Sequence, residues 1–314
     1  MSPPRWQVLI AGAGWRVWRF VVPALLNEGI SREQMTIVRR SASAELHPVL
    51  RPVRTVTSFR ELSGGAFDLT LNCVLEESLL AVQQELVRRY PRAVHLCDTP
   101  IFSRADDLRE VVRLSKVPVY SLEDWPLMPN LEFLAAEMRR AEGNASLSIE
   151  HFGIPGHFLS LYRSICGRRH SLRGLRKVDG GLAGEPRSGW LVRFRQPKQF
   201  AVAKASLRTQ RALLQDFHEV ETTAHSESEI IYRIIGDSSV RYYHGARELS
   251  AHRIEPEILE AFQPFDDRKN VHELDKCVAL CRLFRSVSGG ADSMAYSYLS
   301  SARDAWTARR FGAT

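Results

Sequence analysis

The sequence is poor in cysteine and has none of the cysteine spacings that are typical of metal sites. Its 314 residues include five cysteines, and no two of them form a Cys-x-x-Cys pair. Because free cysteine is among the most buried residue types, we expect small, buried, apolar side chains. The acidic turn at residues 265–267 lacks EF-hand spacing, so we predict no metal site. The five residues are Cys73, Cys97, Cys166, Cys277 and Cys281.

Long hydrophobic runs are also absent. No apolar run approaches the roughly 20 residues of a membrane span, and the first residues, MSPPRWQ, lack the apolar core of a signal peptide. The sequence therefore predicts a cytoplasmic protein that does not bind a membrane. The length and a charged fraction of 25% favour a globular protein of two domains.

The charge is unbalanced but widely distributed. Lysine and arginine number 43 against 36 acidic residues, which gives a formal net charge of +7. The sequence has no long basic run and no stretch in which basic and aromatic residues alternate, as nucleic-acid-binding proteins often have. The excess of positive charge suits an anionic cofactor or a small anionic substrate as well as it suits a nucleic acid. We expect a small-molecule ligand and no nucleic acid, and nucleic-acid binding stays an alternative suggested by charge alone.

Strand and helix patterns alternate along the first 124 residues. Short apolar runs rich in β-branched residues predict buried strands, and apolar residues at helical spacing follow most of them. Such alternation is typical of βαβ units, so we predict a doubly wound parallel sheet. The expected strands are 8–11, 35–38, 68–73, 93–97 and 117–121, with helices beginning after Gly14, near Leu79 and at Ala105.

The first strand ends in Gly12-Ala13-Gly14, directly before a helix. A side chain at Gly12 would obstruct the tight turn, and one at Gly14 would keep a diphosphate away from the amides of the helix start. The motif G-x-G-x-x-G is incomplete, because Val17 stands at its third glycine. We predict dinucleotide binding here. The alternative is a domain that kept the fold and lost the ligand.

Arg39-Arg40-Ser41 follows the second strand, where an NAD-selective site usually carries an acidic residue for the ribose 2′-hydroxyl. Two guanidinium groups and a hydroxyl suit a 2′-phosphate instead, through charge-assisted hydrogen bonds. The sequence therefore favours NADP (NADPH) over NAD. A solvated pair of surface arginines is the alternative.

The second half alternates between apolar and polar residues in several segments. These segments predict a mostly antiparallel sheet with one solvated face, which could also serve as a homodimer interface. Gly180–Gly184 is expected to be a mobile loop, and Ile235–Ser238 a hairpin turn. The expected strands are 145–152, 189–194, 200–205, 217–222, 229–235 and 239–243, and helical spacing returns at 256–286.

Five stretches give the chain a resemblance to a known family. The sequence resembles the glucose–fructose oxidoreductase and inositol dehydrogenase family (Gfo/Idh/MocA). The resemblance implies a Rossmann domain at 1–124, an α+β domain at 125–290 for substrate and oligomer contacts, and a C-terminal segment, 291–314, that packs back on the first domain. The stretches are Leu9–Gly14, His95–Ile101, Glu123–Pro129, Gly153–Gly167 and Tyr298–Phe311.

The same resemblance identifies candidate catalytic residues and two departures. His157 falls on the family's catalytic histidine, and Gly153 replaces the acid before it. Thr99 replaces the lysine of the E-K-P segment; it stays a catalytic candidate, because it can hydrogen-bond a carbonyl or ribose, although it cannot donate a proton as an ammonium does. Asp98 stands at the E-K-P glutamate. Tyr120, at the end of a strand that faces the crevice, is a second proton donor candidate. A packing role for His157 and a solvated hydroxyl for Tyr120 remain open.

The other candidates follow from their positions near strand ends. Asp124 and His151 are weaker candidates for acid–base chemistry, and the basic stretch 167–177 could receive an anionic substrate. The cofactor-binding candidates are Gly12, Gly14, Trp15, Arg16, Val17, Arg39, Arg40, Ser41, Asn72, Cys73, Asp98 and Thr99.

These residues predict an NADP-dependent oxidoreductase that reduces a C=O or C=N bond of a small biosynthetic intermediate. Hydride transfer requires orientation, a dry pocket and a proton donor, and these residues could supply them. The alternative is a redox-inactive binding or partner protein of the same fold, which the replaced lysine and acid would favour.

Overall fold

The chain divides into two units. The computed structural model describes residues 6–41, 45–62, 65–99, 107–141, 143–150, 155–166, 172, 174–179, 181–195, 204–210, 217–223, 231–265, 268–288 and 296–310. Unit 1 comprises Met1–Asp124 and Ala279–Trp306, and unit 2 comprises Trp125–Val278 and Thr307–Thr314. The sequence predicted three parts, 1–124, 125–290 and 291–314, and these domain boundaries remain a prediction. The division by contacts falls inside two helices instead, α7 (Arg268–Ser288) and α8 (Tyr298–Arg310).

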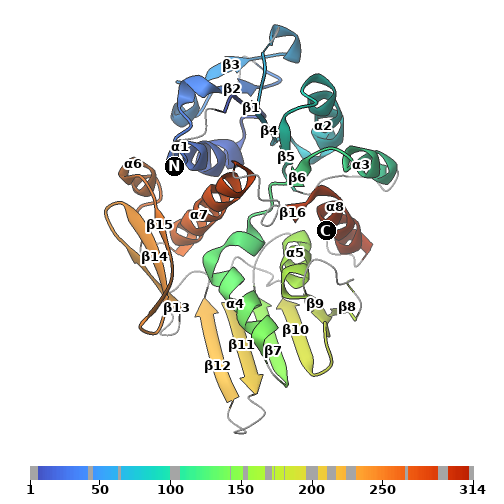
Figure 1. Cartoon of the computed structure of the whole chain (residues 1–314), viewed down its shortest axis with the longest axis vertical. Coiled ribbons are helices and arrows are strands. Elements are labelled where there is room, and N and C mark those ends of the chain that lie inside the picture. The colour runs from blue at the N-terminus through green and yellow to red at the C-terminus, as the bar shows by residue number, and fades with distance from the viewer. Residues whose placement is uncertain are drawn as a thin grey trace. The chain divides into compact units, whose positions relative to one another are not determined.

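Unit 1 contains a seven-stranded sheet in the order β16-β6-β5-β4-β1-β2-β3 (Figure 1). The neighbouring strands from β6 to β3 run parallel, and β16 pairs antiparallel with β6. The predicted doubly wound parallel sheet is therefore confirmed, and two edge strands, β3 and β16, were not expected. The bounds are β1 Val8–Ala11, β2 Met35–Val38, β3 Arg54–Val56, β4 Leu69–Asn72, β5 Val94–Cys97, β6 Val119–Ser121 and β16 Tyr296–Ser297.

The central strands are apolar because helices cover both faces of the sheet. Every residue of β1, β2 and β4 is buried, as expected for inner strands of a parallel sheet. In the register of these strands, Val8 of β1 lies opposite Met35 of β2 and Leu69 of β4. This places the ends of β1, β2 and β4 at one level along the edge.

Helices follow the strands of unit 1. The expected helix after Gly14 is present, although Val17–Val21 forms a π-helical turn before α1 (Val22–Asn27). Val17, Phe20 and Val21 are buried, which accounts for their helical spacing. The other elements are η2 Arg32–Gln34, η3 Pro48–Leu50, η4 Phe59–Glu61, α2 Glu76–Arg89 and α3 Leu108–Leu114.

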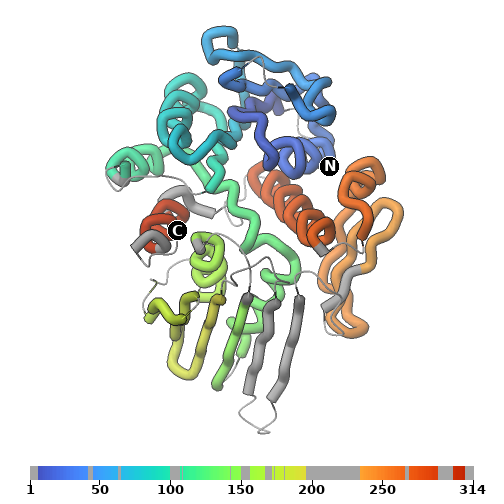
Figure 2. Tube along the Cα trace, turned by 180° about the vertical axis from the view of Figure 1, so that it is seen from behind, coloured from blue at the N-terminus to red at the C-terminus, as the bar shows by residue number. Residues whose placement is uncertain are grey.

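The second half of α7 belongs to unit 1 and packs against α1 (Figure 2). Arg285 Nε and Nη2 donate to the two carboxylate oxygens of Glu28 at 2.6 and 2.8 Å. One turn earlier the buried thiol of Cys281 lies 3.9 Å from the carbonyl oxygen of Ala24. All five cysteines are free; Cys97, Cys277 and Cys281 are buried as expected, and Cys73 and Cys166 are partly exposed.

Among its described residues, unit 2 contains two sheets and four helices in addition to the first half of α7. The larger sheet has the order β12-β11-β7-β10-β9-β8, and only β7 and β10 run parallel; the smaller is β13-β14-β15. The mostly antiparallel sheet is confirmed. The strands are β7 Ala145–Glu150, β8 Arg176–Val178, β9 Gly181–Gly184, β10 Trp190–Arg195, β11 Lys204–Gln210, β12 Phe217–Thr223, β13 Ile231–Ile235, β14 Ser239–His244 and β15 Arg247–Arg253; the helices are η6 Trp125–Leu127, α4 Pro129–Arg140, α5 Pro155–Cys166 and α6 Pro256–Glu260.

Aromatic side chains fill the space between α5 and the larger sheet. The rings of Phe158 and Phe194 stack at 5.1 Å between centroids, and Tyr162 meets Phe194 edge-on. The expected hairpin at 235–238 is confirmed, because β13 and β14 pair antiparallel across it and Gly236 N–H donates to the carbonyl of Ser239.

The prediction of a mobile loop at Gly180–Gly184 is wrong for residues 181–184, which form β9. The glycines permit close packing there. A Cβ on Gly181 would lie 1.8 Å from the carbonyl oxygen of Phe194, and one on Gly184 would lie 2.7 Å from the ring of Tyr162. Residue 180 lies outside the described residues.

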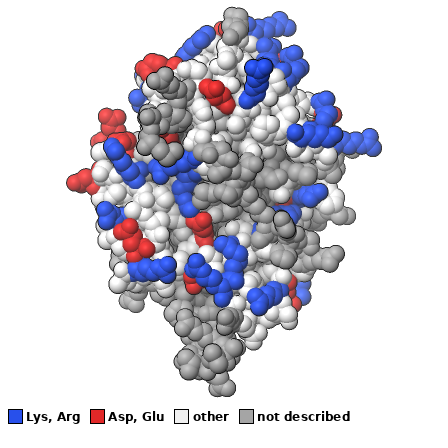
Figure 3. All heavy atoms as spheres, viewed as in Figure 1, with Lys and Arg blue, Asp and Glu red and all other residues white. Residues whose placement is uncertain are grey.

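The surface shows mixed charge. In Figure 3 basic and acidic side chains are interspersed on the described part of one face. Within the described residues, no helix combines the length and the apolar character that crossing a membrane requires.

Candidate functional site

The carboxyl edge of the parallel sheet in unit 1 gathers most of the predicted cofactor residues. Gly12 follows β1 and Arg39 follows β2. Asn72 ends β4, Cys73 follows it, and Asp98 follows β5. The first strand pairs with β2 on one side and with β4 on the other. This is the switch point at which open α/β sheets bind ligands.

The two glycines of the turn differ in their surroundings. Gly12 has a φ of +107°, and a Cβ on it would lie 2.4 Å from the carbonyl oxygen of Cys73. Its N–H donates to the carbonyl of Val38 at 2.8 Å. A Cβ on Gly14, by contrast, would lie within 4 Å of no heavy atom in the described part of the chain. The fold itself therefore requires Gly12, whereas Gly14 borders open space.

The start of the helix presents side chains in different directions. Trp15 is 48% exposed, and its ring meets Phe20 edge-on at 4.8 Å. Val17 is fully buried in the core, and its N–H donates to the carbonyl of Gly14. The side chain of Val17 therefore serves packing, and the N–H groups of Val17 and Trp18 both donate to the carbonyl of Gly14. The amides of the first helical residues, Trp15 and Arg16, precede them, and amides at this position of a helix suit an anion.

Arg16 extends along the strand ends and makes three polar contacts. Its Nε lies 2.8 Å from Asp98 Oδ1, its Nη1 lies 3.2 Å from Asp124 Oδ2, and its Nη2 donates to the carbonyl of Leu122 at 2.7 Å. We refer to Arg16, Asp98 and Asp124 as the strand-edge network. Burial alone would lower the pKa of Arg16, but the carboxylates of Asp98 and Asp124 raise it above its ordinary value. The guanidinium therefore stays charged.

Asp98 is held from two sides. Its Oδ1 accepts a hydrogen bond from the N–H of Thr99 at 2.9 Å and also forms the ion pair with Arg16.

Burial, together with the nearby carboxylate of Asp98, raises the pKa of the Cys73 thiol well above its usual range. Cys73 is therefore a neutral thiol at this edge.

Asn72 serves the fold. Its side chain is buried, and Nδ2 donates to the carbonyl of Leu79 at 2.8 Å and to Gln83 Oε1 at 3.2 Å. These bonds join the end of β4 to α2. The side chain predicted to contact the cofactor is thus used to position the helix.

The basic pair after β2 lies at the surface of unit 1. Arg40 is exposed, and its Nη2 donates to Ser78 Oγ in α2 at 2.9 Å. Arg39 is partly buried, its N–H donates to the carbonyl of Val56, and Ser41 is exposed. The contact between Arg40 and Ser78 spans from the end of β2 to the helix that follows β4. No feature of the sequence pointed to Ser78.

The proton donor candidates lie in different units. Tyr120 belongs to β6 of unit 1, where it is half-buried and pairs with Ser297 of β16. His157 lies in the first turn of α5 in unit 2, and its ring stacks on the buried Trp125 at 5.4 Å with an interplanar angle of 2°. His151, Gly153 and His170 lie outside the described residues, as does most of the basic stretch 167–177.

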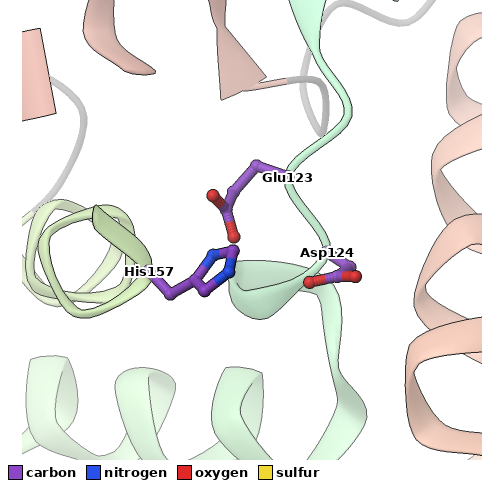
Figure 4. A group of neighbouring side chains, drawn as sticks. All are labelled: Glu123, Asp124 and His157. Carbon is purple, nitrogen blue, oxygen red and sulfur yellow. The ribbon is translucent and has the colours of Figure 1, made fainter. Parts of the chain in front are cut away.

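Two consecutive acids follow β6. Glu123 and Asp124 are 2% and 0% exposed, and Figure 4 shows their side chains on the segment that leaves β6. From the sequence, Asp124 was only a weak acid–base candidate, Glu123 was not singled out, and no ionic partner was predicted for Arg16. Two adjacent acids directly before a buried tryptophan were the available signal, because buried acids need cationic partners.

Comparisons with known proteins identify the fold. No protein-family model matches the sequence, and no curated protein matches it. Among solved structures, the chain is similar to a myo-inositol dehydrogenase from Corynebacterium glutamicum, with a TM-score of 0.59 and 11% identity over 97% of this chain and 94% of that one.

Two further structures show the same likeness. KijD10, a 3-ketoreductase from Actinomadura kijaniata in complex with NADP and TDP-benzene, has a TM-score of 0.58 and 12% identity over 95% and 94% of the two chains. An oxidoreductase from Agrobacterium radiobacter in complex with NAD+, L-tartaric acid and magnesium has a TM-score of 0.53 and 12% identity over 99% and 97%. The chain therefore has the fold of Gfo/Idh/MocA-type oxidoreductases, as the sequence motifs predicted.

Proposed function

We propose that the chain is an NADP(H)-dependent oxidoreductase that reduces a C=O or C=N bond of a small biosynthetic intermediate. The solved structures that share its fold include a 3-ketoreductase in complex with NADP. At this level of identity the likeness concerns the fold, so the proposal depends on the residues of this chain.

The open space at Gly14 is the observation that carries the proposal. A diphosphate needs a close approach to backbone amides at a helix start, and a side chain would block it. A Cβ on Gly14 would meet no described atom within 4 Å, and residue 14 is exposed. The turn therefore fits the diphosphate of a dinucleotide.

The preference for NADP depends on Arg40 and its neighbours. An exposed guanidinium at the end of β2, fixed by Ser78, can form charge-assisted hydrogen bonds with a 2′-phosphate. Ser41 is exposed beside it and offers a hydroxyl. No acidic residue stands at positions 39–41 to select the free 2′-hydroxyl.

When bound, a nicotinamide supplies the hydride, and the chain must provide the proton. His157 is the first candidate, because histidine is the side chain most often used as a general acid near neutral pH, and its stacking on Trp125 fixes the ring plane. Tyr120 is the second candidate. Thr99 can donate a hydrogen bond to a carbonyl or ribose oxygen but cannot replace an ammonium group as a proton donor.

The test is a titration of the protein with NADPH and with NADH, followed by the quenching of its tryptophan fluorescence. Tighter binding of NADPH is expected, and Arg40→Gln should weaken NADPH binding by about tenfold with little effect on NADH. Arg88→Gln is the matched control, because Arg88 is also an exposed arginine in unit 1 and pairs with Glu85. Failure of both dinucleotides to bind at millimolar concentration would favour the redox-inactive alternative.

A further inference from the structure

The strand-edge network lies on one side of the glycine turn, and the basic pair lies on the other. In the strand order, β2 flanks β1 on one side, and β4, β5 and β6 follow on the other. A dinucleotide that placed its diphosphate at Gly14 and its 2′-phosphate at Arg40 would extend its other end towards β4 and β5. Asp98 and Arg16 occupy that end of the edge. The inference that follows rests on the proposed function.

The strand-edge network carries a net negative charge. Arg16 supplies one positive charge, and Asp98 and Asp124 supply two negative charges, which leaves a sum of −1. The side chains of Arg16 and Asp98 are 18% and 16% exposed, and that of Asp124 is not exposed. Glu123, also buried, is a further acid next to Asp124. Charges in such covered positions are screened weakly by water and salt.

The contacts fix these charges in place. Asp98 accepts from the backbone N–H of Thr99 and forms an ion pair with Arg16, and Arg16 also donates to the carbonyl of Leu122. Charges held by such contacts reorganise little when a ligand arrives, and this makes their electrostatic effect on the ligand larger.

We propose that the strand-edge network makes the site distinguish the two redox states of the cofactor, because its net negative charge favours the oxidised, cationic nicotinamide ring over the neutral reduced ring. Asp98 is the residue that sets this preference, since it is the more exposed of the two acids and stands at the end of β5. A negative charge fixed at this edge also favours the direction in which a substrate is reduced, because the ring becomes cationic as it gives up the hydride.

The experiment measures the dissociation constants of NADP+ and NADPH by calorimetry for the full chain and for Asp98→Asn. Asparagine keeps the size of Asp98 and can still accept from Thr99 and Arg16, so the substitution removes charge with little change in shape. The ratio of the constant for NADP+ to that for NADPH should rise by about three- to tenfold. Asp98→Ser supplies the same change in charge if the asparagine variant does not fold.

Two control variants separate charge from contact. Arg16→Lys keeps the positive charge while losing the separate contacts of Nε, Nη1 and Nη2 with Asp98, Asp124 and Leu122, so the ratio should stay within about twofold of the unmodified protein. Arg40→Gln should weaken both redox forms by the same factor, because the 2′-phosphate is common to them. An unchanged ratio in an Asp98→Asn protein that binds both forms would overturn this inference alone. If the unmodified protein binds neither form, the proposed function falls, and the inference falls with it.

Discussion

Two glycine-containing segments, one in each unit, show how differently the same residue can be used. Gly12-Ala13-Gly14 ends β1 in unit 1, and Gly181-Leu182-Ala183-Gly184 forms β9 in unit 2. In the second segment both glycines lie against other parts of the protein, at Phe194 and Tyr162. In the first, a Cβ on Gly12 would lie against Cys73, but a Cβ on Gly14 would meet no described atom within 4 Å beyond its chain neighbours and the helix backbone.

The difference shows two uses of glycine: it lets two parts of the protein pack closely, or it leaves room for a ligand to approach the backbone. Three of these four glycines are explained by close packing of the chain on itself. Gly14 has no such explanation among the described residues, and a ligand that approaches the backbone would supply one. Substitution by alanine tests this distinction directly, because it adds one methyl group at each position.

The largest loss of stability is expected for Gly181→Ala. Its Cβ would lie 1.8 Å from the carbonyl oxygen of Phe194, a backbone atom that cannot move without disturbing the pairing of β9 with β10. We expect a loss of about 3 kcal/mol or more in the free energy of unfolding, measured by urea denaturation. Gly236→Ala is the control in unit 2, because its nearest neighbour is Ser239 Oγ at 3.4 Å. Equal stability of the two variants would contradict the packing explanation.

A smaller but clear loss is expected for Gly12→Ala. The substitution places a side chain at a φ of +107° and 2.4 Å from the carbonyl of Cys73, and we expect about 2–3 kcal/mol of destabilisation. The same denaturation experiment measures it. A variant as stable as the parent would show that the backbone at the end of β4 can move to accommodate the methyl group, and that Gly12 is not needed for packing.

The smallest change in stability is expected for Gly14→Ala. With no described atom within 4 Å of the added methyl group, the free energy of unfolding should change by no more than about 0.5 kcal/mol. Affinity for NADPH should nevertheless fall by about tenfold or more, because the methyl group keeps a diphosphate from the amides. A stable variant that binds NADPH as tightly as the parent would remove the main support for the dinucleotide site.

The fold could be predicted where the pattern was local and strong. Continuous apolar runs such as Val8–Ala11 identified the inner strands, because such strands are buried on both faces. The edge strands Arg54–Val56 and Tyr296–Ser297 were missed, since short strands at an edge need little apolar character. The segment Gly181–Gly184 was mistaken for a loop because the close contacts that order it come from distant Phe194 and Tyr162.

The candidate site was predictable in its position but only partly in its contacts. The glycine turn and the ends of β4 and β5 follow from the alternation of strands and helices. The ion pairs of Arg16 do not, because they join positions 16, 98 and 124, which are far apart in the sequence. The packing role of Asn72 could not be predicted either. Its partners Leu79 and Gln83 lie on α2, and no local sequence pattern shows which face of that helix turns towards Asn72.

Unit 1 is built from two segments that are distant in the sequence, and this has a consequence for the synthesis of the chain. Residues 279–306 complete this unit, and Leu283, Phe284 and Ala302 within them are buried. A ribosome makes residues 1–124 before residues 279–306, so the partners of their exposed apolar surface emerge only after residues 125–278 have been made. A fragment limited to residues 1–124 should therefore aggregate, and recombinant production of this unit requires that residues 279–306 be joined to it.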